Sequence, residues 1–534
     1  MSRAKTIIVN TMLLTAVSLL MRSVGMVFQV WLTRKIGAAG IGLFQLIMSV
    51  SMLAATFAIS GIRFAATRLV SMELGAGNES GARAAVKRCL AYAFCFGTAA
   101  SLFLWFGAPV VGGVWIGDGR TVLSLRVLSL SLTPYALSAV FAGYFTAVRR
   151  VVKSAAVSVA EQLIRILAIV IALGASAGRG LEISCAVVVA GGVAGEMSAF
   201  LMLAALYLLE KRGWWAVAAE RGLTRRMLGI AAPLALSAYA RSALSTLQHL
   251  LVPRGFKKAG ASAEKALADY GTVHGMVFPI LMFPSALFYS FAELVVPELT
   301  DAQVRGDKER ISELVSRSLR LCLFFSVGFM ACMWGFGNEL GSAVYGSGDT
   351  GRYLAGLAWL MPIMYLDSVT DGMLRGLGQQ MYCMAYNILD SAVSVTLVYL
   401  LLPRFALAGY VFMIAFTEIF NFALSLNRLR RVTVIRFSAG RALKSLLAAF
   451  GAVNFTRLAA AFLRFPASRT AAALAMNISL CFAIYAALLM LLGCLDASET
   501  AGVKNFFAGI VKRAPAWYTD AVKNHLKIGG RKNV

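Results

Sequence analysis

The sequence predicts an all-α polytopic membrane protein with about fourteen transmembrane helices. Of its 534 residues, 59% are hydrophobic and only 14% are charged, and the mean hydropathy is +0.75. Soluble domains carry about 25% charged residues. Apolar runs of roughly 20 residues, the length that crosses a bilayer, recur along the whole chain. Together these observations exclude a soluble globular fold.

The apolar runs follow one another with short polar connections. The first run comes after Arg3 and Lys5. It is too long for the core of a signal peptide and lacks a clear small-residue cleavage site, so we expect it to be retained as a helix. The expected spans are 6–33, 41–70, 89–112, 122–148, 154–176, 183–209, 227–252, 269–299, 318–337, 353–374, 383–402, 408–426, 442–463 and 470–494.

The distribution of positive charge predicts the orientation. The net charge is +26, and most of the 51 Lys and Arg residues lie in segments on the same side as the N-terminus. The positive-inside rule therefore places both termini in the cytoplasm of a plasma-membrane protein. The basic tail is expected to lie on anionic lipid headgroups. We expect no nucleic-acid partner, because no nucleic-acid-binding module surrounds the tail.

The chain lacks the patterns of catalysis and of metal binding. It contains three histidines, and no HExxH, GxSxG or nucleotide-binding pattern is present. We therefore expect no catalytic residues, no metal site, no bound cofactor and no enzyme activity.

Two segments in the middle of the chain indicate an internal duplication. "GNESGARAAVKRCL" (77–90) resembles "GDKERISELVSRSL" (306–319) at an offset of 229 residues. The same offset pairs the acidic residues Glu161 and Asp390. Matched rare polar residues in apolar helices favour duplication over chance, and such repeats build the two halves of many transporters.

A second match has a slightly different offset. "RSVGMVFQVWLTRK", which starts at Arg22, resembles "RSALSTLQHLLVPR", which starts at Arg241, at an offset of 219. We expect the loop near 253–268 to be about ten residues longer than the loop near 34–40, so a single insertion there reconciles both offsets.

The duplication predicts two lobes that run in the same topological sense, related by an axis along the membrane normal. Each lobe has six spans, and two C-terminal spans are additional. The expected units are an N-terminal lobe (1–210), an amphipathic cytoplasmic linker (211–226), a C-terminal lobe (227–427), a basic linker with spans thirteen and fourteen (428–495), and a basic cytoplasmic tail (496–534).

The order of these segments resembles a known superfamily. The resemblance rests on "RKIGAAGIGLFQLIMSV", "GYFTAVRRVVKSAAVSVAEQLIRI" and "VVPELTDAQVRGDKERISELVSRSLR". They look like the multidrug/oligosaccharidyl-lipid/polysaccharide flippase superfamily, in its polysaccharide transporter, stage V sporulation protein B-like branch. The resemblance implies two lobes in pseudo-twofold arrangement around a central cavity, and alternating access for a lipid-linked saccharide.

Three arginines within spans are candidate substrate-binding residues. Arg22 and Arg241 occupy matching positions in the first helix of each lobe, and Arg63 lies in the second span. A charge at this depth is costly unless it faces a hydrated cavity or a partner. Two guanidiniums facing a cleft suit a diphosphate, which arginine binds through forked hydrogen bonds. The alternative is that each arginine snorkels or pairs inside its own lobe.

Span eight carries no arginine, and in this the sequence departs from the lipid II flippase branch of the superfamily. It has His274, Glu293 and Glu298 instead. This difference leaves lipid II itself in doubt as the substrate.

Two sets of carboxylates are candidates for structural pairs or for coupling to an H⁺ or Na⁺ gradient. Glu161 and Arg165 stand four residues apart and share a helix face, which favours an ion pair. The alternative is that Glu161, with Asp390 as its counterpart, binds a coupling cation. Asp367 and Asp371 also lie one turn apart in span ten, where they either hold a cation or, for Asp371, pair with Arg375.

The predicted function is translocation of a lipid-linked oligosaccharide or polysaccharide precursor with an anionic diphosphate headgroup. We expect the protein to be a monomer. One alternative is a multidrug or cation antiporter of the same superfamily, whose cavity would be acidic or aromatic. Another is a membrane-embedded polymerase, which would carry a large outward loop with catalytic carboxylates. The sequence does not distinguish envelope, capsule and spore assembly.

Overall fold

We describe a computed structural model of the chain, covering residues 3–176, 178–210, 222–436, 438–462 and 471–494. These residues form helices joined by short turns, and no strand occurs among them. The linker expected at 211–226 lies outside the described residues up to 221, as does the basic tail at 496–534. The protein is an all-α, multi-pass membrane protein, as the sequence predicts.

The first part of the chain forms one helical lobe. Its elements are α1 (Arg3–Ile59), α2 (Ile62–Gly75), α3 (Glu79–Val110), the π-helix η1 (Val111–Ile116), the 3₁₀ turn η2 (Gly119–Thr121), α4 (Val122–Ala147), α5 (Val151–Ala175) and α6 (Leu181–Glu210).

The remaining elements form the second lobe and an accessory pair. They are α7 (Leu223–Lys258), α8 (Ala263–Tyr270), the π-helix η3 (Gly271–Val277), α9 (Phe278–Met282), α10 (Ser285–Val304), α11 (Lys308–Tyr345), α12 (Gly348–Leu357), the 3₁₀ turn η4 (Ala358–Leu360), α13 (Met361–Gly376), α14 (Gln380–Val432), α15 (Ala439–Phe462) and α16 (Ala471–Leu491).

Two helices are too long to cross a membrane once. Helix α1 has 57 residues and α14 has 53, which at 1.5 Å per residue is roughly 80 Å against a hydrocarbon core of about 30 Å. Each contains one non-helical residue, Gly37 (φ 73°) in α1 and Ala406 (φ 46°) in α14, so each comprises two passes.

Length and composition identify ten candidate spans among the described residues, with each long helix counted once. Two further apolar stretches, α8 to α10 and α12 to α13, are each divided into several helices and are not among these ten. With α1 and α14 each counted as two passes and these two stretches added, the helices accommodate fourteen passes. The exact number stays a prediction.

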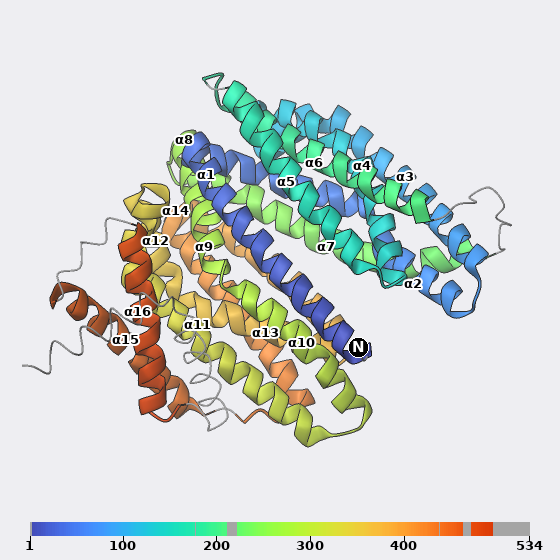
Figure 1. Ribbon diagram of the computed structural model, residues 1–534. Coiled ribbons are helices and arrows are strands. Elements are labelled where there is room, and N and C mark those ends of the chain that lie inside the picture. The colour runs from blue at the N-terminus through green and yellow to red at the C-terminus, as the bar shows by residue number, and fades with distance from the viewer. Residues whose placement is uncertain (1–2, 177, 211–221, 437, 463–470, 495–534) are drawn as a thin grey trace, which may run out of the picture.

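Helices α1 and α7 lie in the middle of the molecule, and the other helices of the two lobes lie on either side of them (Figure 1). Helix α4 packs against α2, α3 and α6, whereas α11 packs against α12 and α13. Helix α7 contacts both α14 and α1, so it joins the two lobes. The accessory helices α15 and α16 pack against α11 at the outer edge of the second lobe (Figure 1).

The turns between helices have the same conformations at positions 229 residues apart. Gly77 (φ 73°) corresponds to Gly306 (φ 71°), and Gly117 (φ 76°) corresponds to Gly346 (φ 70°). These left-handed conformations favour glycine. The N-caps repeat as well: Asn78 matches Asp307, and Asp118 matches Ser347.

Two glycines at this same offset meet where the lobes touch. A Cβ on Gly42 would lie 2.0 Å from the backbone oxygen of Leu267, and a Cβ on Gly271 would lie 2.1 Å from the backbone oxygen of Ala38. Such distances are impossible for a real side chain, so only glycine lets the helices approach this closely.

The loop expected near 34–40 is reduced to a single break at Gly37 within α1. The corresponding connection in the second lobe contains the turn 259–262 and the short helix α8. These additional residues account for the difference between the two sequence offsets.

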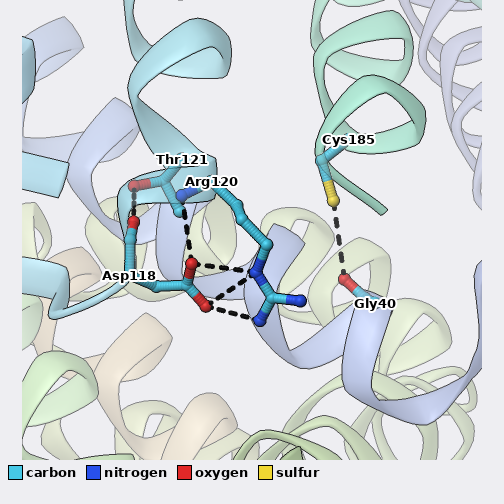
Figure 2. A network of polar contacts seen from close by, with 5 residues as sticks. All are labelled: Gly40, Asp118, Arg120, Thr121 and Cys185. Carbon is cyan, nitrogen blue, oxygen red and sulfur yellow. Dashed lines mark hydrogen bonds and ion pairs between the residues drawn. The ribbon is translucent and has the colours of Figure 1, made fainter. Parts of the chain in front are cut away.

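The connection between η1 and α4 is fastened by a compact polar network (Figure 2). The Arg120 guanidinium donates to the Asp118 carboxylate at 2.6 to 3.2 Å, and Thr121 Oγ1 donates to the Asp118 backbone oxygen at 2.8 Å. Burial raises the pKa of Asp118, but the hydrogen bonds and positive charge of Arg120 outweigh burial and lower that pKa below its ordinary value. The carboxylate is therefore ionised at neutral pH, and the turn is held closed.

Candidate functional site

A cavity of about 500 Å³ lies between the two lobes. The first lobe contributes α1 residues such as Gln45 and Ser49, and the second contributes Arg241 and His249 from α7 with His274 from η3. Its lining is rich in hydroxyl groups, and arginine is the one formally charged residue type in it. No carboxylate is among the described residues that line it. We call it the central cavity.

Hydrogen bonds between lobes lie along its walls. Thr246 Oγ1 donates to the Ser49 backbone oxygen at 2.9 Å, and Thr56 Oγ1 donates to Ser242 Oγ at 3.3 Å. Both contacts join α1 to α7. Each is a single polar contact between the lobes.

A cluster of rings borders the central cavity. The imidazoles of His249 and His274 have centroids 4.5 Å apart, and the Tyr270 ring is stacked on His274 at 5.5 Å. The Tyr270 hydroxyl lies 3.2 Å from His249 Nδ1. His274 lies in a π-helix, a rare geometry often found at functional sites. Sequence reasoning used His274 only as a contrast with lipid II flippases and gave neither histidine a role.

Two arginines join the lobes at one end of the molecule. Arg34 of α1 donates to the backbone oxygens of Val344 (2.8 Å) and Ala343 (2.7 Å), which end α11 in the second lobe. Arg254 of α7 donates to the backbone oxygens of Val114 and Trp115, in η1 of the first lobe. Helix C-termini carry partial negative charge, which favours a guanidinium there. We call these contacts the arginine latches.

The structure places the three predicted substrate arginines differently. All three side chains are exposed. Arg241 lines the central cavity, whereas neither Arg22 nor Arg63 is among the described lining residues. The facing pair of Arg22 and Arg241 therefore stays a prediction.

A second cavity, of about 610 Å³, lies inside the first lobe. It is lined by α1, α4, α5 and α6 and contains Glu161, Arg165 and Glu196. The Arg165 guanidinium hydrogen-bonds to Glu161, one turn away, and to Glu196 at 3.2 Å. Two carboxylates thus share one arginine. Glu196 was not among the predicted site residues, although its carboxylate lies in the apolar run "VVVAGGVAGEM" and this was the available signal.

The second lobe holds a cluster of oxygen-bearing side chains. Asp371 accepts hydrogen bonds from Ser425 Oγ (3.0 Å) and Asn387 Nδ2 (3.3 Å). Asp367 accepts one from Asn421 Nδ2 at 2.9 Å. The described ion pairs do not include one between Asp371 and Arg375, which lies one turn further on in the same helix.

Several oxygens of this cluster have no partner. Buried oxygens without a described hydrogen bond include Oδ1 of Asp367 and Oδ1 of Asn421, and Oδ1 of Asp390 nearby on α14 is a third. Hard cations such as Na⁺ favour such carboxylate and amide oxygens. No group of three or more His, Cys, Asp or Glu residues in the described chain has the geometry of a metal site.

Comparisons with known proteins agree with this fold. The family model described as "polysaccharide biosynthesis protein" matches residues 7–303, and the MatE model matches residues 260–400. Stage V sporulation protein B of Bacillus subtilis (strain 168) is 22% identical over 406 residues, 75% of this chain and 78% of that protein.

Lipid II flippase MurJ of Bacillus subtilis (strain 168) is 21% identical over 418 residues, covering 73% of this chain and 76% of that protein. A solved structure of lipid II flippase MurJ in an inward closed conformation superposes with a TM-score of 0.67 at 13% identity, over 90% of this chain and 98% of that one. The chain therefore belongs to the polysaccharide biosynthesis protein family, in the polysaccharide transporter branch of the multidrug/oligosaccharidyl-lipid/polysaccharide superfamily.

Proposed function

We propose that the protein is a flippase that carries a lipid-linked saccharide with an anionic phosphate-bearing headgroup across the plasma membrane. The observation that carries the proposal is the composition of the central cavity. Both lobes line it, Arg241 supplies positive charge, and no described carboxylate opposes that charge. A cavity of this kind attracts an anion and repels an organic cation.

The chemistry of the lining suits both parts of such a headgroup. Arg241 can form forked hydrogen bonds to phosphate oxygens. Hydroxyl groups such as those of Ser242, Ser245 and Thr246, with His249, are donors and acceptors for sugar hydroxyls. A lipid-linked substrate also accords with the relative that is described as a lipid II flippase.

Alternating access would proceed by opening one end of the interface between α1 and α7 while the other closes. In the described conformation, the arginine latches join the two lobes at the end that contains Arg34 and Arg254. The charge distribution predicts that this end faces outward. Outward opening would require both latches to break.

The energy source is proposed to be an H⁺ or Na⁺ gradient. The cluster around Asp367 and Asp371 offers unpartnered oxygens to a cation, and Glu161 with Glu196 forms a second acidic site in the first lobe. Cation binding at either site would change the packing of helices that also line the interface between the lobes. No chemical change of the substrate is proposed.

The test is transport in proteoliposomes. Purified protein is reconstituted with an undecaprenyl-diphosphate sugar, and the fraction of substrate on the far leaflet is measured with a membrane-impermeant lectin or enzyme. We expect translocation by the wild type and its loss in Arg241→Ala. Arg305→Ala is the matched control, because Arg305 is exposed and pairs with Asp301 away from the cavity.

The same vesicles separate this function from its rivals. Efflux of organic cations without movement of the lipid-linked sugar would indicate the antiporter that the MatE match also permits. A new product on chromatography would indicate an enzyme. Either result would contradict the proposal.

A further inference from the structure

The central cavity has two ends that differ in chemistry. Along α7, Arg241, Ser245 and His249 line it at intervals of four residues, and residues with this spacing share one face of a helix. Eight residues rise by about 12 Å along a helix axis. The guanidinium and the imidazole of α7 therefore extend from points about 12 Å apart, with a hydroxyl group between them.

The hydrogen bonds between α1 and α7 fix what lies opposite each end. Thr56 of α1 pairs with Ser242, and Ser49 pairs with Thr246. The two helices therefore run in opposite directions along the cavity. Gln45, one turn beyond Ser49 on α1, also lines the cavity and lies at the end that contains the imidazole of α7.

Three planar polar side chains meet at this end. The rings of His249 and His274 have centroids 4.5 Å apart. A Cβ on Gly275 would lie 3.5 Å from Gln45 Cγ, so Gln45 packs beside the residue that follows His274. We call Gln45, His249 and His274 the imidazole end. No Lys, Arg, Asp or Glu is among these three residues, whereas the other end holds the guanidinium of α7.

The imidazole end has free capacity for hydrogen bonds. No contact described in the structure occupies the Gln45 amide or the ring nitrogens of His274. His249 Nδ1 lies 3.2 Å from the Tyr270 hydroxyl, which leaves Nε2 for a ligand. Tyr270 itself is fully buried, so it positions the imidazole and does not reach the cavity. Half-buried polar groups without partners are stabilised by a ligand that supplies donors and acceptors.

We propose that the imidazole end is a saccharide subsite, which binds the first sugar of the lipid-linked headgroup while Arg241 holds the diphosphate. This inference rests on the proposed function and assigns the two parts of the substrate to the two ends of the cavity. Sugar hydroxyls donate and accept, and so do an amide and a neutral imidazole. The separation of the two ends accommodates a diphosphate followed by one sugar ring.

The arrangement selects an uncharged sugar, such as a hexose or an N-acetylhexosamine. A uronic acid would place its carboxylate at the imidazole end, where none of the three side chains is a fixed cation. Burying a carboxylate without a paired charge is costly.

The arrangement also orients the substrate. His249 lies five residues before Arg254 on α7, so the saccharide lies nearer than the diphosphate to the arginine latches. Opening at the latches would expose the sugar before the diphosphate.

The experiment compares three lipids on the full chain, purified in a neutral detergent. They are undecaprenyl diphosphate without a sugar, undecaprenyl-diphosphate N-acetylglucosamine and an undecaprenyl-diphosphate uronic acid. Dissociation constants are measured together with thermal melting of the same preparation. We expect the N-acetylglucosamine lipid to bind about ten-fold or more tightly than the sugar-free lipid, because several hydrogen bonds are added. The uronic acid lipid should bind more weakly than the N-acetylglucosamine lipid.

Variants assign this preference to residues. Gln45→Leu with His249→Phe keeps the size of both side chains and removes their hydrogen bonds, so the preference for the sugar-bearing lipid should disappear. Arg241→Gln should instead weaken the binding of both lipids by the same factor. Asn454→Leu is the matched control, because the exposed Asn454 amide donates within its own helix to the Phe450 backbone oxygen at 2.9 Å. If the double variant fails to fold, His249→Gln keeps a donor and an acceptor and should retain part of the preference.

The outcomes separate the subsite from the transport function. Equal binding of the sugar-free and N-acetylglucosamine lipids by the wild type would overturn the subsite and leave a diphosphate-binding flippase. A preference that persists in the double variant, or that is also lost in Asn454→Leu, would overturn the residue assignment. Equal or tighter binding of the uronic acid lipid would overturn the choice of an uncharged sugar. If the wild type binds none of the three lipids, the proposed function fails and the subsite fails with it.

Discussion

Arg34 and Arg254 make the same contact on opposite lobes. Each arginine ends the first helical pass of its own lobe and donates to the carbonyl oxygens that end the third pass of the other lobe. The acceptors are Val114 and Trp115 for one latch, and Ala343 and Val344 for the other, positions that are 229 residues apart. The pseudo-twofold relation therefore extends to the contacts between lobes.

We predict that breaking both latches favours the outward-open state. An exposed arginine bound to backbone oxygens contributes about 1 kcal/mol, so Arg34→Ala with Arg254→Ala should shift the ratio of states by roughly 30-fold. The measurement is labelling of a cysteine introduced at Ser245 in the central cavity by an impermeant thiol reagent added from outside. Arg352→Ala is the control, because Arg352 pairs locally with Asp349 at the same end of the molecule. An unchanged labelling rate in the double variant would show that the latches do not hold this end closed.

Arg241→Ala should weaken binding of an undecaprenyl-diphosphate sugar by about ten- to a hundred-fold, because charge-assisted hydrogen bonds contribute about 1.5 to 3 kcal/mol. Arg241→Lys should restore part of the affinity, since it keeps the charge and loses the fork. Binding is measured on purified variants together with thermal melting. Normal affinity in Arg241→Ala would mean that the substrate does not contact this side chain.

Arg22→Ala should have a similar effect if Arg22 approaches the substrate in another state of the cycle. A structural role predicts a different result: Arg22→Ala would lower the melting temperature and leave the affinity of the folded fraction unchanged. Measuring both quantities on one preparation distinguishes the two. The second result would place Arg22 in its own lobe.

Asp371→Asn should uncouple transport from its driving gradient. The substitution keeps the size of the side chain and removes the charge that a cation needs. Translocation is followed in proteoliposomes with an imposed Na⁺ gradient, an imposed H⁺ gradient or neither. Asp349→Asn on the surface is the control. If Asp371→Asn responds to the gradients like the wild type, the cluster is structural.

Gly42→Ala and Gly271→Ala should each destabilise the protein by about 1 to 3 kcal/mol, the usual result of overpacking. The added methyl group would collide with backbone oxygens of the other lobe at 2.0 and 2.1 Å. Gly229→Ala in α7 meets no atom within 4 Å and serves as the control. Thermal melting in detergent measures the effect. Equal melting temperatures for all three variants would show that the lobes are not in this close contact in solution.

Reporter fusions after residues 260 and 534 should place these positions on opposite sides of the membrane, with residue 534 in the cytoplasm. The reason is the excess of Lys and Arg on the side of the termini. Alkaline phosphatase is active outside and a fluorescent protein folds inside, so the pair gives opposite signals. An outward C-terminus would mean that the number of passes is odd.

Much of the architecture follows from the sequence because hydropathy and turn chemistry are local properties. Apolar runs of about 20 residues predicted the helices. Matched polar segments at an offset of 229 predicted corresponding positions, and the same positive φ angles occur at Gly77 and Gly306. The ion pair between Glu161 and Arg165 was expected from their spacing by one helical turn, and the structure contains that contact.

The tertiary structure decided which of these residues meet. The contact that Thr67 makes with the Gly143 oxygen (3.1 Å) recurs between Thr300 and the Gly376 oxygen (3.0 Å), so both partners lie at an offset of 233 and not 229. A shift of four residues is about one helical turn and leaves the hydropathy pattern nearly unchanged, so the apolar pattern does not fix the offset in these helices.

For the same reason, the sequence selected Arg22, Arg63 and Arg241 as one set, whereas packing placed only Arg241 among the described residues that line the central cavity. Spacing along a helix fixes which residues share a face. Which face meets the other lobe depends on the packing of all the helices together, and no local pattern in the sequence records it.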